Sequence, residues 1–137
     1  MRRWLLLITV PFLLLSCERI YINGDLDGMW KLHSVESADT VVYPDGIYYS
    51  FQRHLVMLGE HHEEGFPDYY LAQFDKVGDT LTMSGFYKYP VSQGICDSKE
   101  LEKYHIFADT VRFCIEVFDA DVLVMNDGER RYSFRKW

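Results

Sequence analysis

YYLAQFDK-VGD-TLTMSGFY, residues 69–87, is the stretch of sequence that decides the fold class. From Thr80 to Gly85, hydroxyl-bearing residues alternate with apolar ones, which is the period of two typical of a strand with one buried face. Val77-Gly78-Asp79 suits a compact hairpin connection, because Gly78 can adopt a positive φ. The stretch therefore predicts two antiparallel strands, Tyr69–Lys76 and Thr80–Tyr87, against a core.

The same pattern continues on both sides of this hairpin. Aromatic residues make up 16% of the chain and Tyr occurs ten times, a composition that favours strands. The polar run Gln52-Arg53-His54 divides one long β-like segment in two, and Asn126-Asp127-Gly128 is a strong hairpin signal. The further predicted strands are Gly28–Glu36, Ile47–Gln52, His54–Leu58, Thr110–Phe118, Asp121–Asn126 and Glu129–Lys136.

Residues 88–109 interrupt the strand pattern. Pro90 and Gly94 precede a polar segment in which Asp97 or Ser98 can cap a helix. We expect one short helix of about two turns, placed before the last three strands.

Seven or eight antiparallel strands in about 110 residues must close into a barrel or stack as two sheets, because one open sheet would expose an apolar face and free edges. Short connections favour an all-β, up-and-down barrel, whose interior can hold side chains or one small ligand. A two-layer β-sandwich is the alternative.

The N-terminus carries a second signal. Arg2 and Arg3 precede an apolar run that ends in Leu14-Leu15-Ser16-Cys17, the layout of a secretory signal. These four residues resemble the lipobox of bacterial lipoproteins, which implies cleavage before Cys17 and lipidation of that cysteine.

We therefore expect residues 1–16 to be a signal peptide, residues 17–27 a lipidated tether and residues 28–137 the folded domain. The protein would be held by its lipid on a membrane of the bacterial envelope, the outer membrane being favoured. An ordinary secretory peptide or a short membrane anchor is the alternative, but the apolar run is shorter than the roughly 20 residues of a membrane span.

The charge of the chain limits the classes of molecule that it can bind, and its cysteines raise a separate question of pairing. Loss of the signal peptide would change the formal net charge from −7 to −9, which argues against binding nucleic acid. With Cys17 acylated, Cys96 and Cys114 would remain in an oxidising compartment, either as a disulfide or as two unpaired cysteines.

Asp27-Gly28-Met29-Trp30 resembles the Gly-x-Trp signature of lipocalins, and the layout of the mature chain is similar to small lipocalin-like lipoproteins of Bacteroidetes-type bacteria. The resemblance implies that Gly28 allows close entry to the barrel, that Trp30 plugs one end, and that an arginine of the last strand packs over the indole. Arg135 is preferred over Arg131 for that role.

Aromatic residues of the strands are candidates to line a ligand site, with Tyr48, Phe74 and Phe86 as the chosen positions. The alternative is that these rings fill the core. His61 and His62, within Glu60–Glu64, are weak candidates for a metal site, and a solvated acidic loop is the preferred interpretation. We expect no cofactor.

Catalysis has little support, because no serine lies in a Gly-x-Ser-x-Gly context and no phosphate-binding glycine loop is present. The sequence predicts a non-enzymatic envelope lipoprotein whose barrel binds a small hydrophobic ligand or an envelope partner. The first alternative is a filled barrel that acts as an interaction module through loops 59–68 and 88–98. An enzyme of unknown type is the third.

Overall fold

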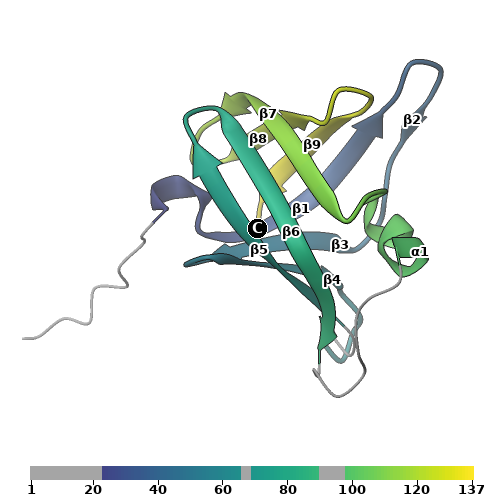
Figure 1. Cartoon of the computed structure of the whole chain (residues 1–137). Coiled ribbons are helices and arrows are strands. Elements are labelled where there is room, and N and C mark those ends of the chain that lie inside the picture. Colours follow the sequence, from purple (N-terminus) through teal and green to yellow (C-terminus); the bar gives the residue numbers. More distant parts are fainter. Residues whose placement is uncertain (1–22, 66–68, 90–97) are drawn as a thin grey trace, which may run out of the picture.

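A computed structural model describes residues 23–65, 69–89 and 98–137 of the chain (Figure 1). Within these ranges, nine strands form one antiparallel sheet. The strands are β1 (Gly28–Glu36), β2 (Val41–Val42), β3 (Ile47–Gln52), β4 (Leu55–Glu60), β5 (Tyr69–Val77), β6 (Thr80–Tyr89), β7 (Thr110–Phe118), β8 (Val122–Asn126) and β9 (Arg131–Lys136). The short helices are η1 (Gly24–Leu26), α1 (Ser98–Leu101) and η3 (Glu102–Tyr104).

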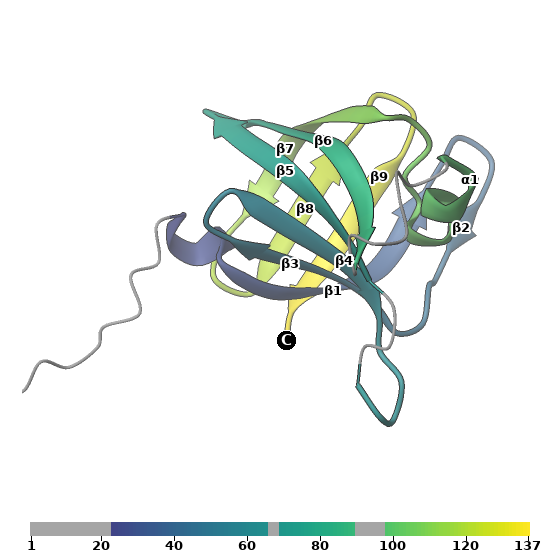
Figure 2. The same ribbon diagram turned by 60° about the horizontal axis from the view of Figure 1, so that its bottom comes forward.

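The sheet closes on itself because β1 pairs with both β3 and β9. From β3 to β9, each strand pairs with the next one in the sequence, which makes an up-and-down barrel. The two-residue strand β2 pairs only with the end of β1 and extends outside the ring as an arm (Figures 1 and 2). The predicted all-β, lipocalin-like barrel is confirmed, with β2 as the additional strand.

The predicted division of the long β segment is also confirmed. Arg53, at φ 57°, turns the chain between β3 and β4. The predicted short helix is present as α1 and η3, and it precedes the last three strands as expected.

One end of the barrel, which we call the η1 end, is closed by Trp30 and Leu26. Both side chains are completely buried. The indole Nε1 donates a hydrogen bond of 2.8 Å to the carbonyl oxygen of Leu26, so that the polar atom of the plug is satisfied where water is excluded.

The opposite end is covered by α1, η3 and the residues that follow them. We call residues 98–107 the cap. Leu101, Tyr104 and Ile106 are 0–2% exposed and belong to the same core as Trp30. Figure 2 shows the cap beside the barrel at the end opposite η1.

Large side chains fill the space between the two ends. The largest that are fully buried are Trp30, Tyr49, Tyr104, Tyr132, Phe51, Phe113 and Phe134. These rings come from β1, β3, β7, β9 and η3, so the barrel wall and the cap contribute to one continuous apolar core.

Candidate functional site

The capped end brings together the most unusual chemistry among the described residues. The cap consists of one turn of α-helix and one of 3-10 helix, followed by His105 in the left-handed conformation at φ 62°. This backbone region is uncommon for a residue other than glycine. At His105 the chain turns so that Tyr104 and Ile106 both remain buried.

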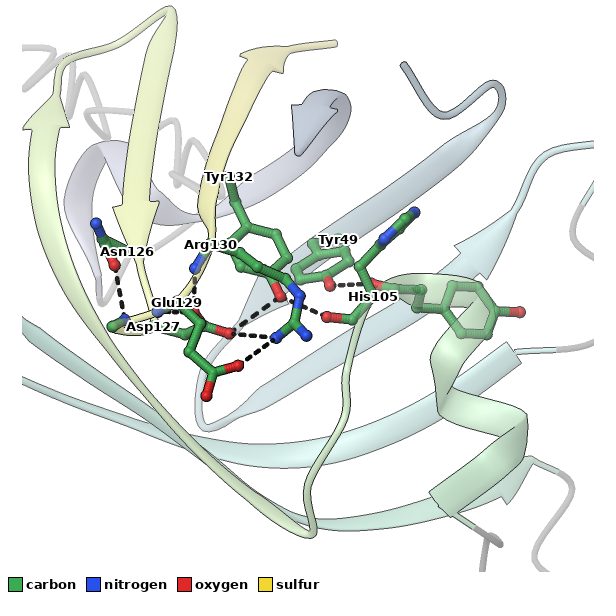
Figure 3. A network of polar contacts seen from close by, with 9 residues as sticks. Tyr49, His105, Asn126, Asp127, Glu129, Arg130 and Tyr132 are labelled. Atoms are coloured by element: carbon green, nitrogen blue, oxygen red, sulfur yellow. Dashed lines mark hydrogen bonds and ion pairs between the residues drawn. The ribbon is translucent and has the colours of Figure 1, made fainter. Parts of the chain in front are cut away.

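Two tyrosines of the barrel wall hold the cap through its backbone. The hydroxyl of Tyr49, on β3, donates to the carbonyl oxygen of Tyr104. The hydroxyl of Tyr132, on β9, donates to the next carbonyl oxygen, that of His105, at 2.6 Å. Figure 3 shows the two phenols approaching the cap from neighbouring parts of the wall. Two consecutive peptide carbonyls are thus bound by two phenol donors in an apolar environment.

A charged turn lies beside these tyrosines. Asp127 lies in the turn between β8 and β9. Its Oδ1 accepts hydrogen bonds from the N–H groups of Glu129 and Arg130 at 2.9 and 2.7 Å. Its other oxygen lies 3.3 Å from the Tyr132 hydroxyl and 3.5 Å from Arg130 Nη1. The Arg130 guanidinium stacks 4.0 Å from the centre of the Phe107 ring, which ties the end of the cap to this hairpin.

Burial controls the protonation of the site. It raises the pKa of Tyr49 well above the ordinary value, with smaller contributions from Tyr132 and Asp127. Burial also raises the pKa of Tyr132, and the Asp127 carboxylate acts in the same direction. Both phenols therefore remain protonated hydrogen-bond donors at neutral pH. Burial, followed by the charge of Arg130, lowers the pKa of His105, so its imidazole is neutral under the same conditions.

Two polar contacts hold the outer side of the cap. Tyr70 donates from its hydroxyl to Glu100 at 3.3 Å, and Lys103 forms an ion pair with Glu60. Lys103 is 55% exposed, and exposed ion pairs contribute little to stability. The buried apolar side chains hold the cap more strongly than these contacts do.

The predicted ligand-lining residues divide between the two faces of the wall. Phe74 and Phe86 belong to the interior core, where they pack as the core-filling alternative expected. Tyr48 does not face the interior, and the choice of this residue was wrong. Its neighbour Tyr49 pairs with Trp30 and shares the inner face, whereas Tyr48 pairs with Lys31 on the outer face.

Tyr48 is nevertheless only 5% exposed, because the C-terminal residue covers it. The ring centres of Tyr48 and Trp137 lie 5.0 Å apart, and the ring of His61 lies 6.0 Å from Tyr48. His61 thus contributes to an aromatic contact on the outer face.

The cation over the barrel plug is also different from the prediction. Lys136 Nζ lies 4.5 Å from the centre of the Trp30 ring and donates to the carbonyl oxygens of Asp25 and Asp27. Arg135 is exposed on the outer face. Because Phe134 is buried, the period of two places position 136 on the inner face and position 135 on the outer face.

Gly28 begins β1 beside Lys136, at the plugged end of the barrel. It has φ 118°, and a Cβ added there would lie 3.0 Å from Lys136 Nζ. A residue with a side chain would be strained at this position and would crowd the cation on the plug.

The remaining candidates are the two histidines proposed as weak metal ligands and the cysteines. No group of three His, Cys, Asp or Glu side chains that could hold a metal occurs in the part of the chain that the structure describes, His61 and His62 included. Cys17 and Cys96 lie outside the described residues, so neither the lipidation nor the disulfide is tested. Cys114 is exposed on β7. The described ranges also contain no helix long and apolar enough to cross a membrane.

Sequence reasoning missed the most specific part of the site, which is the pair Tyr49 and Tyr132. Tyr49 lies opposite Trp30 in the β1–β3 pairing, so the two side chains share the inner face. A prediction of this strand register would have identified Tyr49 as an interior residue. The position of the cap carbonyls could not be inferred, because it depends on how the segment before β7 folds back over the barrel.

Comparison with known proteins agrees with this architecture. Residues 12–137 match the lipocalin-like domain family. The chain belongs to that family. No curated protein sequence matches this lipocalin-like chain.

Solved structures share the lipocalin-like fold. A lipocalin-like protein from Bacteroides uniformis ATCC 8492 has a TM-score of 0.66 at 22% identity, covering 83% of this chain and 100% of its own. An uncharacterized protein from Bacteroides eggerthii DSM 20697 has a TM-score of 0.61 at 19% identity, with 82% and 99% covered. A protein from Burkholderia xenovorans has a TM-score of 0.54 at 13% identity, with 81% and 82% covered. At these identities the similarity supports the fold alone.

Proposed function

We propose that this chain is a non-catalytic lipoprotein of the bacterial cell envelope whose barrel binds a small hydrophobic ligand at the capped end. The proposed location in the cell envelope rests on the signal-like residues 1–16 and on Cys17 as the lipidated residue, with the outer membrane as the favoured membrane. The ligand site rests on the lipocalin-like barrel and on the chemistry of its capped end.

We call the opening of the barrel that the cap covers the mouth. The observation that carries the proposal is the pair of phenol donors inside this apolar mouth. Tyr49 and Tyr132 donate to acceptors that belong to the cap rather than to the barrel wall. Leu101, Tyr104 and Ile106 of the cap fill the adjoining apolar space. The cap therefore occupies the position that a ligand with an apolar body and acceptor oxygens would take.

The free energy needed to displace the cap limits the affinity of the barrel for a small ligand. Burial of a large apolar side chain is worth about 1.5–3 kcal/mol, so the three buried cap side chains oppose release by several kcal/mol. A ligand recovers this free energy only by filling the same space and replacing both acceptors. A neutral ligand is favoured, because Asp127 places a carboxylate beside the Tyr132 hydroxyl.

Native mass spectrometry of the protein purified from its own host tests this proposal. We expect a bound small molecule on the wild type and on Tyr43→Phe, whose ring is 69% exposed and outside the buried core. Its occupancy should fall in Tyr49→Phe and Tyr132→Phe. A molecule retained equally by all four proteins would show that the two phenols do not bind it.

A second candidate function is an interaction module with a filled barrel, which contacts an envelope partner through its surface. The complete burial of the interior rings and the closure of both ends favour it. Binding of the neutral dye Nile red separates the two candidates. If the mouth is a ligand site, Ile106→Ala should bind the dye more tightly than wild type does, because it vacates part of the mouth.

Leu81→Ala is the matched control for this dye experiment. Leu81 is also completely buried, but it lies at the start of β6, at the η1 end. Its removal destabilises the core without opening the mouth. Equal dye binding by both variants would reflect general loosening and would favour the filled barrel.

A further inference from the structure

The η1 end of the barrel exposes an apolar rim. Leu55, Val77, Val117 and Phe118 are large apolar residues with exposed fractions of 39%, 70%, 47% and 37%. Single exposed apolar side chains are ordinary, whereas several gathered at one site often mark a contact surface.

Topology places these four residues at the same end. In an up-and-down barrel every second turn lies at one end, and here the β3–β4, β5–β6 and β7–β8 turns share the end where β1 begins. Figure 1 shows the β5–β6 hairpin on the same side of the barrel as η1.

Three contacts connect these turns to one another and to η1. Asn23 Nδ2 donates to the carbonyl oxygen of Arg53 in the β3–β4 turn at 2.9 Å. The N–H of Ile115 donates to the carbonyl oxygen of Asp79 in the β5–β6 turn at 2.6 Å. The rings of Phe118 and the plug Trp30 lie 6.4 Å apart. These contacts hold the turns that carry the rim residues around the plugged end of the barrel.

The described chain also begins at this end, at Asn23. Six peptide links join Cys17 to Asn23, and at about 3.6 Å each they reach about 22 Å at most. A lipid on Cys17 would hold this end within that distance of a bilayer, whereas the capped end lies at the far side of the barrel.

We propose that the apolar rim at the η1 end docks against the lipid bilayer that carries the anchor. This inference rests on the lipidation of Cys17 in the proposed function. The docked barrel turns its capped mouth away from the membrane, toward the aqueous compartment, so that a ligand is exchanged with water or with a soluble partner.

The charges of the rim indicate which lipids suit it. Lys76 Nζ lies 5.9 Å from the centre of the Phe118 ring, where its stem can lie along the apolar surface while the ammonium reaches headgroup phosphates. Asp79 and Asp119 occupy neighbouring turns. With both signs present, the rim suits zwitterionic headgroups, and docking should not require anionic lipid.

The test uses the full lipidated protein reconstituted in phosphatidylcholine vesicles, with and without bromine on the acyl chains. Val77→Trp and Val117→Trp report on the rim in a Trp137→Phe background. Val42→Trp, on β2 beyond the far end of β1, is the control, because Val42 is 44% exposed and Val117 is 47% exposed. Brominated lipid should quench both rim probes and leave the control unchanged.

Two further measurements separate the outcomes. Partition into a detergent phase and the mass of the N-terminal peptide establish whether Cys17 is lipidated, which tests the proposed function by itself. A lipidated protein whose rim probes are quenched no more than Val42→Trp would overturn the docking proposal. Rim probes shielded from aqueous acrylamide yet unaffected by bromine would also overturn it, because a second protein copy would then cover the rim.

Discussion

Raising the pH above 10 should destabilise this barrel through two particular tyrosines. Tyr49 and Tyr132 are completely buried, and burial raises the pKa of each phenol above its ordinary value. In the unfolded chain both titrate near pH 10. Because the folded pKa is the higher one, the stabilisation is fully present below pH 10 and is lost as the pH rises toward the folded value.

The magnitude follows from the linkage relation. One pH unit above its unfolded pKa, each buried phenol lowers the free energy of unfolding by about 1.4 kcal/mol. The two together should remove about 3 kcal/mol at pH 11, a large part of the 5–15 kcal/mol typical of a domain. The loss should increase further until the folded pKa is reached.

Urea unfolding followed by circular dichroism at pH 8, 9, 10 and 11 measures this effect. The Tyr49→Phe/Tyr132→Phe double variant should lose about 3 kcal/mol less than wild type between pH 8 and pH 11. Tyr43→Phe, at an exposed position, should retain the wild-type pH dependence. If the double variant loses as much stability as wild type over this interval, the two phenols are not buried donors and the description of the capped end is wrong.

Three further substitutions test other parts of the structure. Lys136→Met should lower the free energy of unfolding by about 1–3 kcal/mol, since it removes the cation and its hydrogen bonds from the plug, whereas Arg135→Met should change it by less than about 0.5 kcal/mol in urea titrations. Gly28→Ala should be clearly more destabilising in thermal unfolding than Gly24→Ala, because only position 28 has both a positive φ and a close neighbour; equal effects would contradict the crowding at Lys136. Ile106→Ala should cost about 2–5 kcal/mol by the same urea assay if the cap is part of the core, and a cost below about 1 kcal/mol would show that the cap packs loosely.

The periodicity of the sequence predicted the strands well but left the inner and outer faces open. A shift of one residue reverses which side chains enter a barrel, and both corrected residues, Tyr48 and Arg135, are one position away from the residues that point inward. For the last strand the information was present in the sequence, since the aromatic residues Tyr132 and Phe134 alternate with polar residues, which predicts the inner face for position 136.

A β-bulge explains another difference between the alternation in the sequence and the observed inner face of the barrel. The register shifts between Ile115 and Val117 where β7 pairs with β8, so the alternation that runs through Phe113 and Ile115 is interrupted, and Val117 is exposed. A pattern of period two cannot anticipate an extra residue in one strand. Val117 therefore does not continue the buried face formed by Phe113 and Ile115.

The site depended on non-local contacts that no sequence pattern specifies. The sequence predicted a short helix near Glu100, but not that Leu101, Tyr104 and Ile106 would enter the barrel mouth. These residues contact a wall formed by strands far away in the chain, including Tyr49 at 55 positions from Tyr104.

The pairing of β1 with β9 also determines when the protein can finish folding. Trp30 is opposite Lys136, so the ring cannot close until β9 is available to pair with β1, and contacts over such long separations form slowly. A nascent polypeptide would retain an open edge at β1 until β9 has been synthesised. If the chain is exported as proposed, this late closure would keep it unfolded for translocation, and pairing of the six residues of β9 with β1 would be the step that commits it to the native state.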